Sequence, residues 1–216
     1  MTIRASLFDL DSTLYPASLG FQHLLDMRIM VYMSELLGVP IDEARTIRRG
    51  YFSTYGTTLR GLQIHHQVDT EEFLAYVHDL PFDEYLQPDA ELGVLLGQLQ
   101  GEKAIFTNSP IEHTNKVLSH LGIADHFNHI FDIRFQEFNP KPDIVGYQQA
   151  LAILGVQGSE AVMIEDTLKN LATARHLGMM TIYIADAPPD DNEHPADSVV
   201  SDIYQAIQAV IERQRV

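Results

Sequence analysis

The sequence contains no cysteine and no tryptophan, and it is poor in basic residues. Without cysteine the chain has no disulfide framework, no thiolate metal site and no cysteine nucleophile. Lysine and arginine together number 14 against 30 aspartates and glutamates, which gives a formal net charge of −16. Because no run of basic residues offsets this charge, a nucleic acid polymer is a poor partner for the chain.

Long apolar segments are absent as well. The longest stretch without Asp, Glu, Lys or Arg covers residues 144–159, and its glutamines and glycines make it unsuitable for spanning a membrane. The first residues, MTIRASLFDLD, contain no apolar segment of signal-peptide length before Asp9 and Asp11. We therefore expect a cytoplasmic protein without a membrane partner. Its 216 residues suffice for one domain, or one domain with a sizeable insertion, to bury a core.

The hydrophobic pattern changes character twice along the chain. A short apolar run, Ile3–Leu10, ends in acidic residues and predicts a buried strand. Between residues 16 and 86 the apolar positions recur at helical spacing. Within this segment we expect helices over residues 18–37, 42–52 and 70–77, and a polar loop over residues 56–61. After Pro88 helices and strands alternate, which is typical of a parallel sheet with crossover helices.

This pattern predicts an α/β fold. The core is expected to be a doubly wound parallel sheet formed by residues 1–15 and 87–216, with an all-helical cap, residues 16–86, inserted after the first strand. Later strands are expected over residues 103–106, 129–133, 161–164 and 181–184, and later helices over residues 89–99, 111–121, 144–154, 168–177 and 203–213. The stretch 186–202, rich in proline and acid, is expected to be a solvated loop.

Three of the predicted strands end abruptly in polar residues. These ends are ASLFDLD (5–11), AIFTNS (104–109) and AVMIEDT (161–167). In a doubly wound sheet ligands bind at the carboxyl ends of the strands, so the three polar ends should meet at one crevice. Asp9 and Asp11 are two positions apart and therefore point to the same side of a strand. Two carboxylates placed in this way repel each other unless a cation lies between them or one keeps its proton.

Each polar end also has a purely structural explanation. Acids or a Thr-Asn pair after a strand often cap a turn or the next helix, and a lysine in a loop is often solvated. The functional explanation gains weight because four such places follow one another in order: Asp9 with Asp11, Thr107 with Asn108, Lys141 between two prolines, and Glu165 with Asp166.

In this order the motifs resemble those of the haloacid dehalogenase superfamily of phosphotransferases. The first is FDLDSTLYP (8–16), and the other three are Thr107-Asn108, Lys141 and Glu165-Asp166, so that the resemblance covers the whole chain. It implies that Asp9 is a nucleophile that forms an aspartyl-phosphate, and that Asp11 is the general acid and base. It also implies that Thr107 and Asn108 hold phosphoryl oxygens while Lys141 offsets negative charge.

The resemblance further implies Mg²⁺ as the cofactor. Its ligands would be the side-chain carboxylates of Asp9 and Asp166 and the backbone carbonyl of Asp11. Glu165 would act directly or through water. The fourth motif departs from the commoner form of the superfamily, in which a glycine precedes the acid and another acid follows one turn later. Here Glu165 and Asn170 take those places. The charge of the chain agrees with a cation, because an anionic substrate has to enter a carboxylate-rich crevice.

Within the superfamily, the chain is similar to the pyrimidine 5′-nucleotidases. YGTTLRGL (55–62), IHHQVD (64–69), Asn170 and the Tyr-Pro that ends the first motif carry this resemblance. It implies a small phosphorylated substrate, namely a nucleoside monophosphate. Arg60 and His65 are the expected substrate-binding residues of the cap, and Tyr15 and His66 are further candidates for substrate contact.

Other reactions on the same scaffold are kept as alternatives: hydrolysis of sugar phosphates or phosphoglycolate, and a sugar phosphomutase reaction. A dehalogenase is disfavoured because Asp11 is present, and a phosphonate hydrolase is disfavoured because residues 16–86 contain no lysine. A non-catalytic binding protein is disfavoured because the set of charged motif residues is intact. The sequence carries no signal for an oligomeric state.

Overall fold

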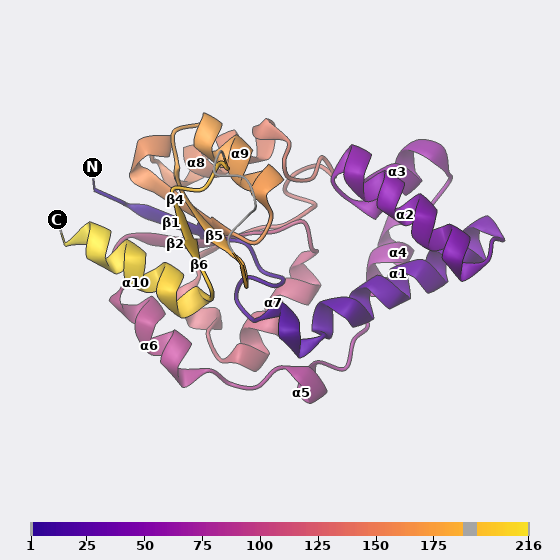
Figure 1. The fold of residues 1–216 in the computed structure, drawn as a ribbon, viewed down its shortest axis with the longest axis horizontal. Coiled ribbons are helices and arrows are strands. Elements are labelled where there is room, and N and C mark those ends of the chain that lie inside the picture. Colours follow the sequence, from indigo (N-terminus) through magenta and orange to yellow (C-terminus); the bar gives the residue numbers. More distant parts are fainter. Residues whose placement is uncertain (1, 188–193, 216) are drawn as a thin grey trace.

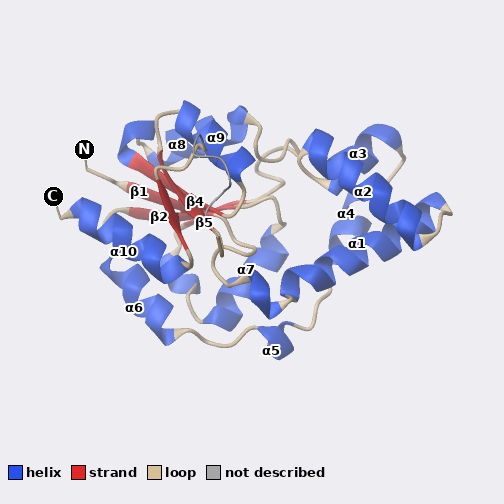
Figure 2. Cartoon of the chain, in the orientation of Figure 1, coloured by secondary structure: helices blue, strands red, loops and turns tan. Residues whose placement is uncertain are grey.

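The computed structural model describes residues 2–187 and 194–215. Within these ranges the strands are β1 (Ala5–Phe8), β2 (Glu102–Phe106), β3 (His129–Phe131), β4 (Ala161–Glu165), β5 (Met180–Ile184) and β6 (Ser198–Val200). They form one six-stranded sheet in the order β3-β2-β1-β4-β5-β6, and every neighbouring pair is parallel (Figures 1 and 2). The predicted α/β fold with a doubly wound parallel sheet is confirmed.

The strand residues alternate between two apolar cores, because successive side chains of a strand point to opposite faces of the sheet. Phe8 and Ile105 belong to one core, whereas Leu7 and Phe106 belong to the other. Figure 1 shows the two helix layers that cover these faces. The first core is completed by α6 (Ala90–Gln98), α7 (Ile111–Leu121) and α10 (Ile203–Gln214), and the second by α8 (Ile144–Leu154) and α9 (Leu168–His176).

Residues 16–86, which we call the helical insertion, contain no strand and are described throughout. Their helices are α1 (Phe21–Leu37), α2 (Ile41–Tyr55), α3 (Thr58–His65), α4 (Thr70–Val77) and α5 (Phe82–Tyr85). Helix α1 packs against α2 and α4, and these helices lie with α3 at one end of the molecule, beyond the sheet (Figure 2). Helix α5 instead contacts α7, where the ring of Phe82 lies 5.5 Å from that of His113.

Two expectations about secondary structure are wrong. Residues 56–61 do not form a loop throughout, because α3 begins at Thr58. The backbone N–H of Arg60 donates to the Thr57 hydroxyl at 3.1 Å, and this N-cap outweighs the glycines that suggested a loop. The stretch 186–202 contains β6, in which Val199 and Val200 pair with β5 in parallel. Residues 188–193 of that stretch lie outside the described residues.

The sheet register brings the motif residues to one edge. Phe8 of β1 is level with Ile105 of β2 and Ile164 of β4, so the residues that follow these strands leave the sheet side by side. The backbone N–H of Asp9 donates to the carbonyl of Ile164 at 2.9 Å. This hydrogen bond holds Asp9 beside β4 at the end of β1. Among the described helices, none is long and apolar enough to cross a membrane.

Candidate active site

A cavity of about 530 Å³ lies where the strand ends meet the helical insertion. The sheet contributes the motif residues Asp9, Asp11, Thr107, Asn108, Lys141, Glu165 and Asp166 to its lining. The insertion contributes apolar side chains from α1, α3 and α4, together with Gln22, Asp26, Arg48 and His78. The polar strand ends and the insertion therefore enclose one common site.

Lys141 joins the first and fourth motifs. Its side chain is 1% exposed, and Nζ donates to Oδ1 of Asp9 and to Oε2 of Glu165, at 2.7 Å in both cases. Burial by itself lowers the pKa of Lys141, but the charges of Asp9 and Glu165 outweigh it and hold that pKa well above its ordinary value. A buried lysine persists here because two carboxylates compensate for its lost hydration.

The backbone of Lys141 is held in place by two amide side chains. Its N–H donates to Oδ1 of Asn108 at 2.8 Å and to Oε1 of Gln136 at 3.1 Å, while Nδ2 of Asn108 donates to the Lys141 carbonyl at 3.2 Å. Nε2 of Gln136 also donates to the carbonyl of Thr107 at 2.7 Å. Asn108, expected to hold phosphate, thus uses both ends of its amide to position the lysine. Gln136 has no motif of its own, and sequence reasoning missed it.

Three carboxylates surround the end of Lys141. Asp9, Glu165 and Asp166 each place an oxygen within 4.8 Å of the others. Burial, followed by repulsion from Glu165, raises the pKa of Asp9 to about 7 and that of Asp166 to about 9. One lysine does not neutralise three acids, and carboxylate oxygens are the ligands that Mg²⁺ prefers. The residues therefore fit a divalent cation beside Asp9 and Asp166, whereas Glu165 is buried against Lys141.

The Asp11 carboxylate has a different set of partners. Oδ1 accepts hydrogen bonds from the Tyr15 hydroxyl at 2.6 Å and from Nε2 of His113 at 2.7 Å, and Oδ2 accepts one from the Ser109 hydroxyl at 2.6 Å. Burial alone would raise the pKa of Asp11, but His113 and the two hydroxyls hold it well below its usual range. Tyr15, a candidate for substrate contact, is buried and bonded to Asp11 instead.

Sequence reasoning missed Ser109 and His113. Both follow the Thr107-Asn108 motif, and His113 lies four residues after Ser109, at the start of α7. Ser109 lies just before the helix, and both side chains bond to the Asp11 carboxylate. A polar residue directly after the second motif, with a histidine four residues later, is the signal that was available in the sequence.

The structure does not bring Arg60 and His65 to the cavity that contains Asp9. His65 lies in a separate groove of the insertion, where its Nε2 is 2.7 Å from the Tyr55 hydroxyl, and the neighbouring His66 lies in the same groove. On α3, Thr58 and Leu59 line the cavity that contains Asp9, whereas Arg60 lines neither that cavity nor the groove that contains His65. Consecutive residues of a helix face different directions, so a motif that spans them does not reach one site as a unit.

Comparison with known proteins agrees with this geometry. A family model for haloacid dehalogenase-like hydrolases matches residues 3–178. The chain belongs to this family. It is similar to Phosphate metabolism protein 8 of Saccharomyces cerevisiae, with 32% identity over 187 residues, which cover 80% of this chain and 58% of the yeast protein. The chain thus spans little more than half the length of that relative.

Solved structures share the fold of this haloacid dehalogenase-like hydrolase over nearly its whole length. A phosphatase of the family from Thermococcus onnurineus has a TM-score of 0.66 and 21% identity, covering 96% of this chain and 98% of its own. An L-2-haloacid dehalogenase from Xanthobacter autotrophicus has a TM-score of 0.62 and 15% identity, covering 97% and 98%. Because a phosphatase and a dehalogenase share the fold, the reaction has to be argued from the side chains.

In this hydrolase the cation that the insertion contributes to the catalytic cavity is Arg48 of α2. Its guanidinium is paired with Asp26 of α1, and the two side chains are 18% and 31% exposed. The pair joins two helices whose residues are 22 positions apart, so no local spacing in the sequence predicts it.

Proposed function

We propose that this hydrolase is a magnesium-dependent phosphomonoesterase that acts through an aspartyl-phosphate intermediate on Asp9. The observation that carries the proposal is the buried arrangement of Asp9, Lys141 and Asp166 at the floor of a cavity, with a second acid, Asp11, two residues away. A dehalogenation needs no acid for the leaving group, so Asp11 favours the phosphatase within the family.

Asp9 is suited to attack phosphorus. Its Oδ1 is bonded to Lys141 at 2.7 Å, whereas Oδ2 has a long contact of 3.5 Å with the Thr13 hydroxyl. In the first step Oδ2 forms a bond to phosphorus and the bond from phosphorus to the leaving oxygen breaks. In this proposal the negative charge of the bound phosphoryl group raises the pKa of Asp11, so that Asp11 takes up a proton with the substrate and gives it to that oxygen. In the second step Asp11 takes a proton from water as the water oxygen attacks phosphorus, which releases phosphate and restores Asp9.

The remaining motif residues bind the phosphoryl group and balance its charge. The Thr107 hydroxyl accepts from the backbone N–H of Ser109 at 3.0 Å, so its own proton is free to bind a phosphoryl oxygen. Lys141 offsets the charge that Asp9 and the substrate share. Asp9, Asp166 and the backbone carbonyl of Asp11 would hold Mg²⁺, which when bound neutralises part of the negative charge on the acids and the phosphoryl oxygens.

For the substrate we propose a nucleoside 5′-monophosphate, most favourably a pyrimidine one. The insertion supplies the walls of the cavity next to the phosphoryl site, and a cavity of this size accepts a nucleoside. Sugar phosphates and phosphoglycolate are the competing substrates, and a sugar phosphomutase is the competing reaction. Its product would be an isomeric sugar phosphate without free phosphate.

The test is phosphate release from nucleoside monophosphates, hexose phosphates and phosphoglycolate, measured with Mg²⁺ and with a chelator. We expect release from pyrimidine nucleotides that depends on Mg²⁺, and loss of turnover in Asp9→Asn purified in the same way. Equal release by Asp9→Asn and the unchanged protein would contradict the mechanism. Release without nucleotide preference would retain the phosphatase and reject the nucleotidase.

A further inference from the structure

The wall that the insertion presents to the catalytic cavity has a polar part and an apolar part. The apolar part contains the side chains of Leu25, Ile29, Leu59, Phe73, Leu74 and Val77, contributed by α1, α3 and α4. A hexose carries hydroxyl groups around its ring, and burying them against this apolar part leaves hydrogen bonds unmade. A flat ring buries its two faces here without that penalty and keeps its polar groups at the edge.

The polar part of this wall includes the set of Asp26, Arg48 and Gln22, together with Ser53, Thr57, Thr58 and His78. Burial raises the pKa of Asp26 above its ordinary value, and the charge of Arg48 acts in the opposite direction. A half-buried ion pair between two helices costs hydration, and apolar side chains of similar size would join the helices equally well. The pair therefore calls for an explanation beyond packing.

Two atoms of this set lack hydrogen-bond partners. In the described part of the chain, five buried side-chain atoms have no partner, and Nε of Arg48 and Oε1 of Gln22 are two of them. Gln22 and Asp26 are one turn apart on α1, so Gln22 lies on the same helix face as the residue that binds Arg48. One residue with an unpaired donor and one with an unpaired acceptor thus line the same cavity, both beside Asp26.

We propose that Arg48 and Gln22 bind the edge of the base in the leaving nucleoside. Nε–H of Arg48 donates to a ring carbonyl oxygen, Oε1 of Gln22 accepts from the adjacent ring N–H, and Asp26 orients the guanidinium. The ligand class is a planar ring with a lactam edge, as in uracil, whose faces contact the apolar wall. Both atoms are covered in this structure, so binding includes a rotamer change of each side chain. This inference rests on the proposed phosphatase function.

An alkyl chain and a bare sugar are the competing leaving groups, and the polar set separates them. An alkyl chain would fill the apolar wall but leave Arg48 and Gln22 unpaired. Ribose without a base has no lactam edge for Arg48 and Gln22 to bind. The selectivity of the enzyme for a lactam edge is therefore the quantity to measure.

The experiment compares kcat/KM for uridine 5′-monophosphate, its N3-methyl derivative, ribose 5-phosphate, an alkyl phosphate and p-nitrophenyl phosphate. The N3-methyl group replaces the ring N–H and leaves both ring carbonyls in place. We expect the unchanged enzyme to prefer uridine 5′-monophosphate over the N3-methyl derivative and over ribose 5-phosphate. Gln22→Leu should lower the preference over the N3-methyl derivative about 2- to 10-fold, because a hydrogen bond between neutral groups is lost, and Arg48→Met should lower the preference over ribose 5-phosphate about 10- to 150-fold, because a hydrogen bond from a charged group is lost.

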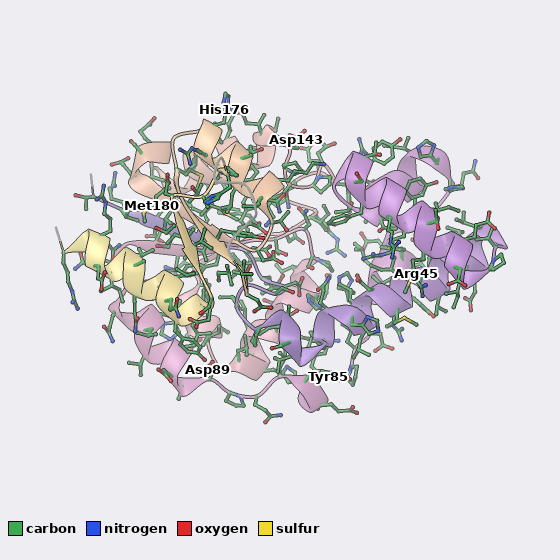
Figure 3. The ribbon with its side chains drawn as sticks, viewed as in Figure 1. Arg45, Tyr85, Asp89, Asp143, His176 and Met180 are labelled. Carbon is green, nitrogen blue, oxygen red and sulfur yellow. The ribbon has the colours of Figure 1, made fainter. Side chains whose placement is uncertain are left out.

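Two further variants keep the test decisive. Arg48→Lys retains a cation beside Asp26 but lacks the Nε donor, so it should lose the preference even if Arg48→Met folds poorly. Arg45→Met is the matched control, because Arg45 lies on the same helix, pairs with Asp42 and is well exposed. Figure 3 labels Arg45 among the insertion helices. This control should leave the preference unchanged.

The outcomes separate this inference from the function on which it rests. An equal loss of kcat/KM on every substrate in Arg48→Met would make the pair structural and overturn the inference. Hydrolysis of p-nitrophenyl phosphate by the unchanged enzyme, without preference for the lactam edge, would overturn the inference and leave the phosphatase intact. No hydrolysis of any substrate would reject the phosphatase itself.

Discussion

The hydrogen bond from His113 to Asp11 gives the sharpest prediction about catalysis. His113 is 1% exposed, lies against the Phe21 and Phe82 rings, and donates from Nε2 to Oδ1 of Asp11 at 2.7 Å. His113→Phe keeps an aromatic ring in this packing and removes the donor. Tyr15 and Ser109 still bind the carboxylate, so the change loosens Asp11 without leaving it unpaired.

The size of the effect follows from the bond that is lost. A hydrogen bond to a charged group contributes about 1.5 to 3 kcal/mol, which corresponds to about 10- to 150-fold in a step that depends on the position of Asp11. A nucleoside leaves as a poor alkoxide and needs a proton from Asp11, whereas p-nitrophenolate leaves without one. The first step should therefore slow for uridine 5′-monophosphate and stay fast for p-nitrophenyl phosphate.

The assay is rapid-quench kinetics with both substrates. For p-nitrophenyl phosphate, His113→Phe should show a burst of nitrophenol equal to the enzyme concentration, because in the proposed mechanism hydrolysis of the aspartyl-phosphate requires Asp11 as a base. For the nucleotide the burst should be absent. His120→Phe, on the same helix but bonded to Asp83 at the surface, is the control and should behave like the unchanged enzyme. An equal loss on both substrates, with no burst, would refute the positioning role of His113.

Three further predictions concern stability. Mg²⁺ at 100 times its dissociation constant should raise the free energy of unfolding by about 2.7 kcal/mol. Asp166→Asn should weaken this effect in urea titrations, and an unchanged gain would remove Asp166 from the metal site. Lys141→Met should cost about 3 to 5 kcal/mol, because it leaves Asp9 and Glu165 buried without a counter-charge. The double variant Lys141→Met with Glu165→Gln should lose less stability than the sum of the two single losses. Strict additivity of the two losses would contradict the prediction. Burial and His113 lower the pKa of His78 from 6.5 to about 3, so the unfolded chain binds a proton between these pH values that the folded chain does not. Stability should therefore fall as the pH drops through this window, by about 2 kcal/mol at pH 5. His78→Gln should remove that part of the pH dependence in urea titrations at pH 5 and 7, whereas an unchanged dependence would mean that His78 is not its source.

The features that sequence reasoning recovered depend on local patterns. The apolar run before Asp9 predicts a buried strand because a central parallel strand is apolar on both faces, and β1 has this environment. Lys141 between two prolines suggested a cation held at a fixed point, and its buried position agrees with that expectation. The order of strands and helices follows from the alternation of their hydrophobic periods.

The features that it missed depend on contacts between distant segments. The pairing of Arg48 with Asp26 is set by the packing of α2 on α1, and the contact of Gln136 with Thr107 and Lys141 by a loop that returns to the end of β2. Residue types alone also do not place Arg60 and His65, since the direction of each side chain depends on how α3 is rotated about its axis. Such rotations are fixed by tertiary packing.

The position of β1 in the sheet has a consequence for how the protein folds while it is synthesised. β1 is synthesised before the other described strands, yet it pairs with β2 at residues 102–105 and with β4 at residues 161–164. Helices α1 to α4 find their partners within residues 21–77. At a synthesis rate of about 5 to 20 residues per second, roughly 8 to 30 seconds pass between the synthesis of Asp9 and that of β4. A nascent chain halted before residue 161 would contain all the insertion helices and the strands β1, β2 and β3, but Asp9 would lack its neighbours on β4.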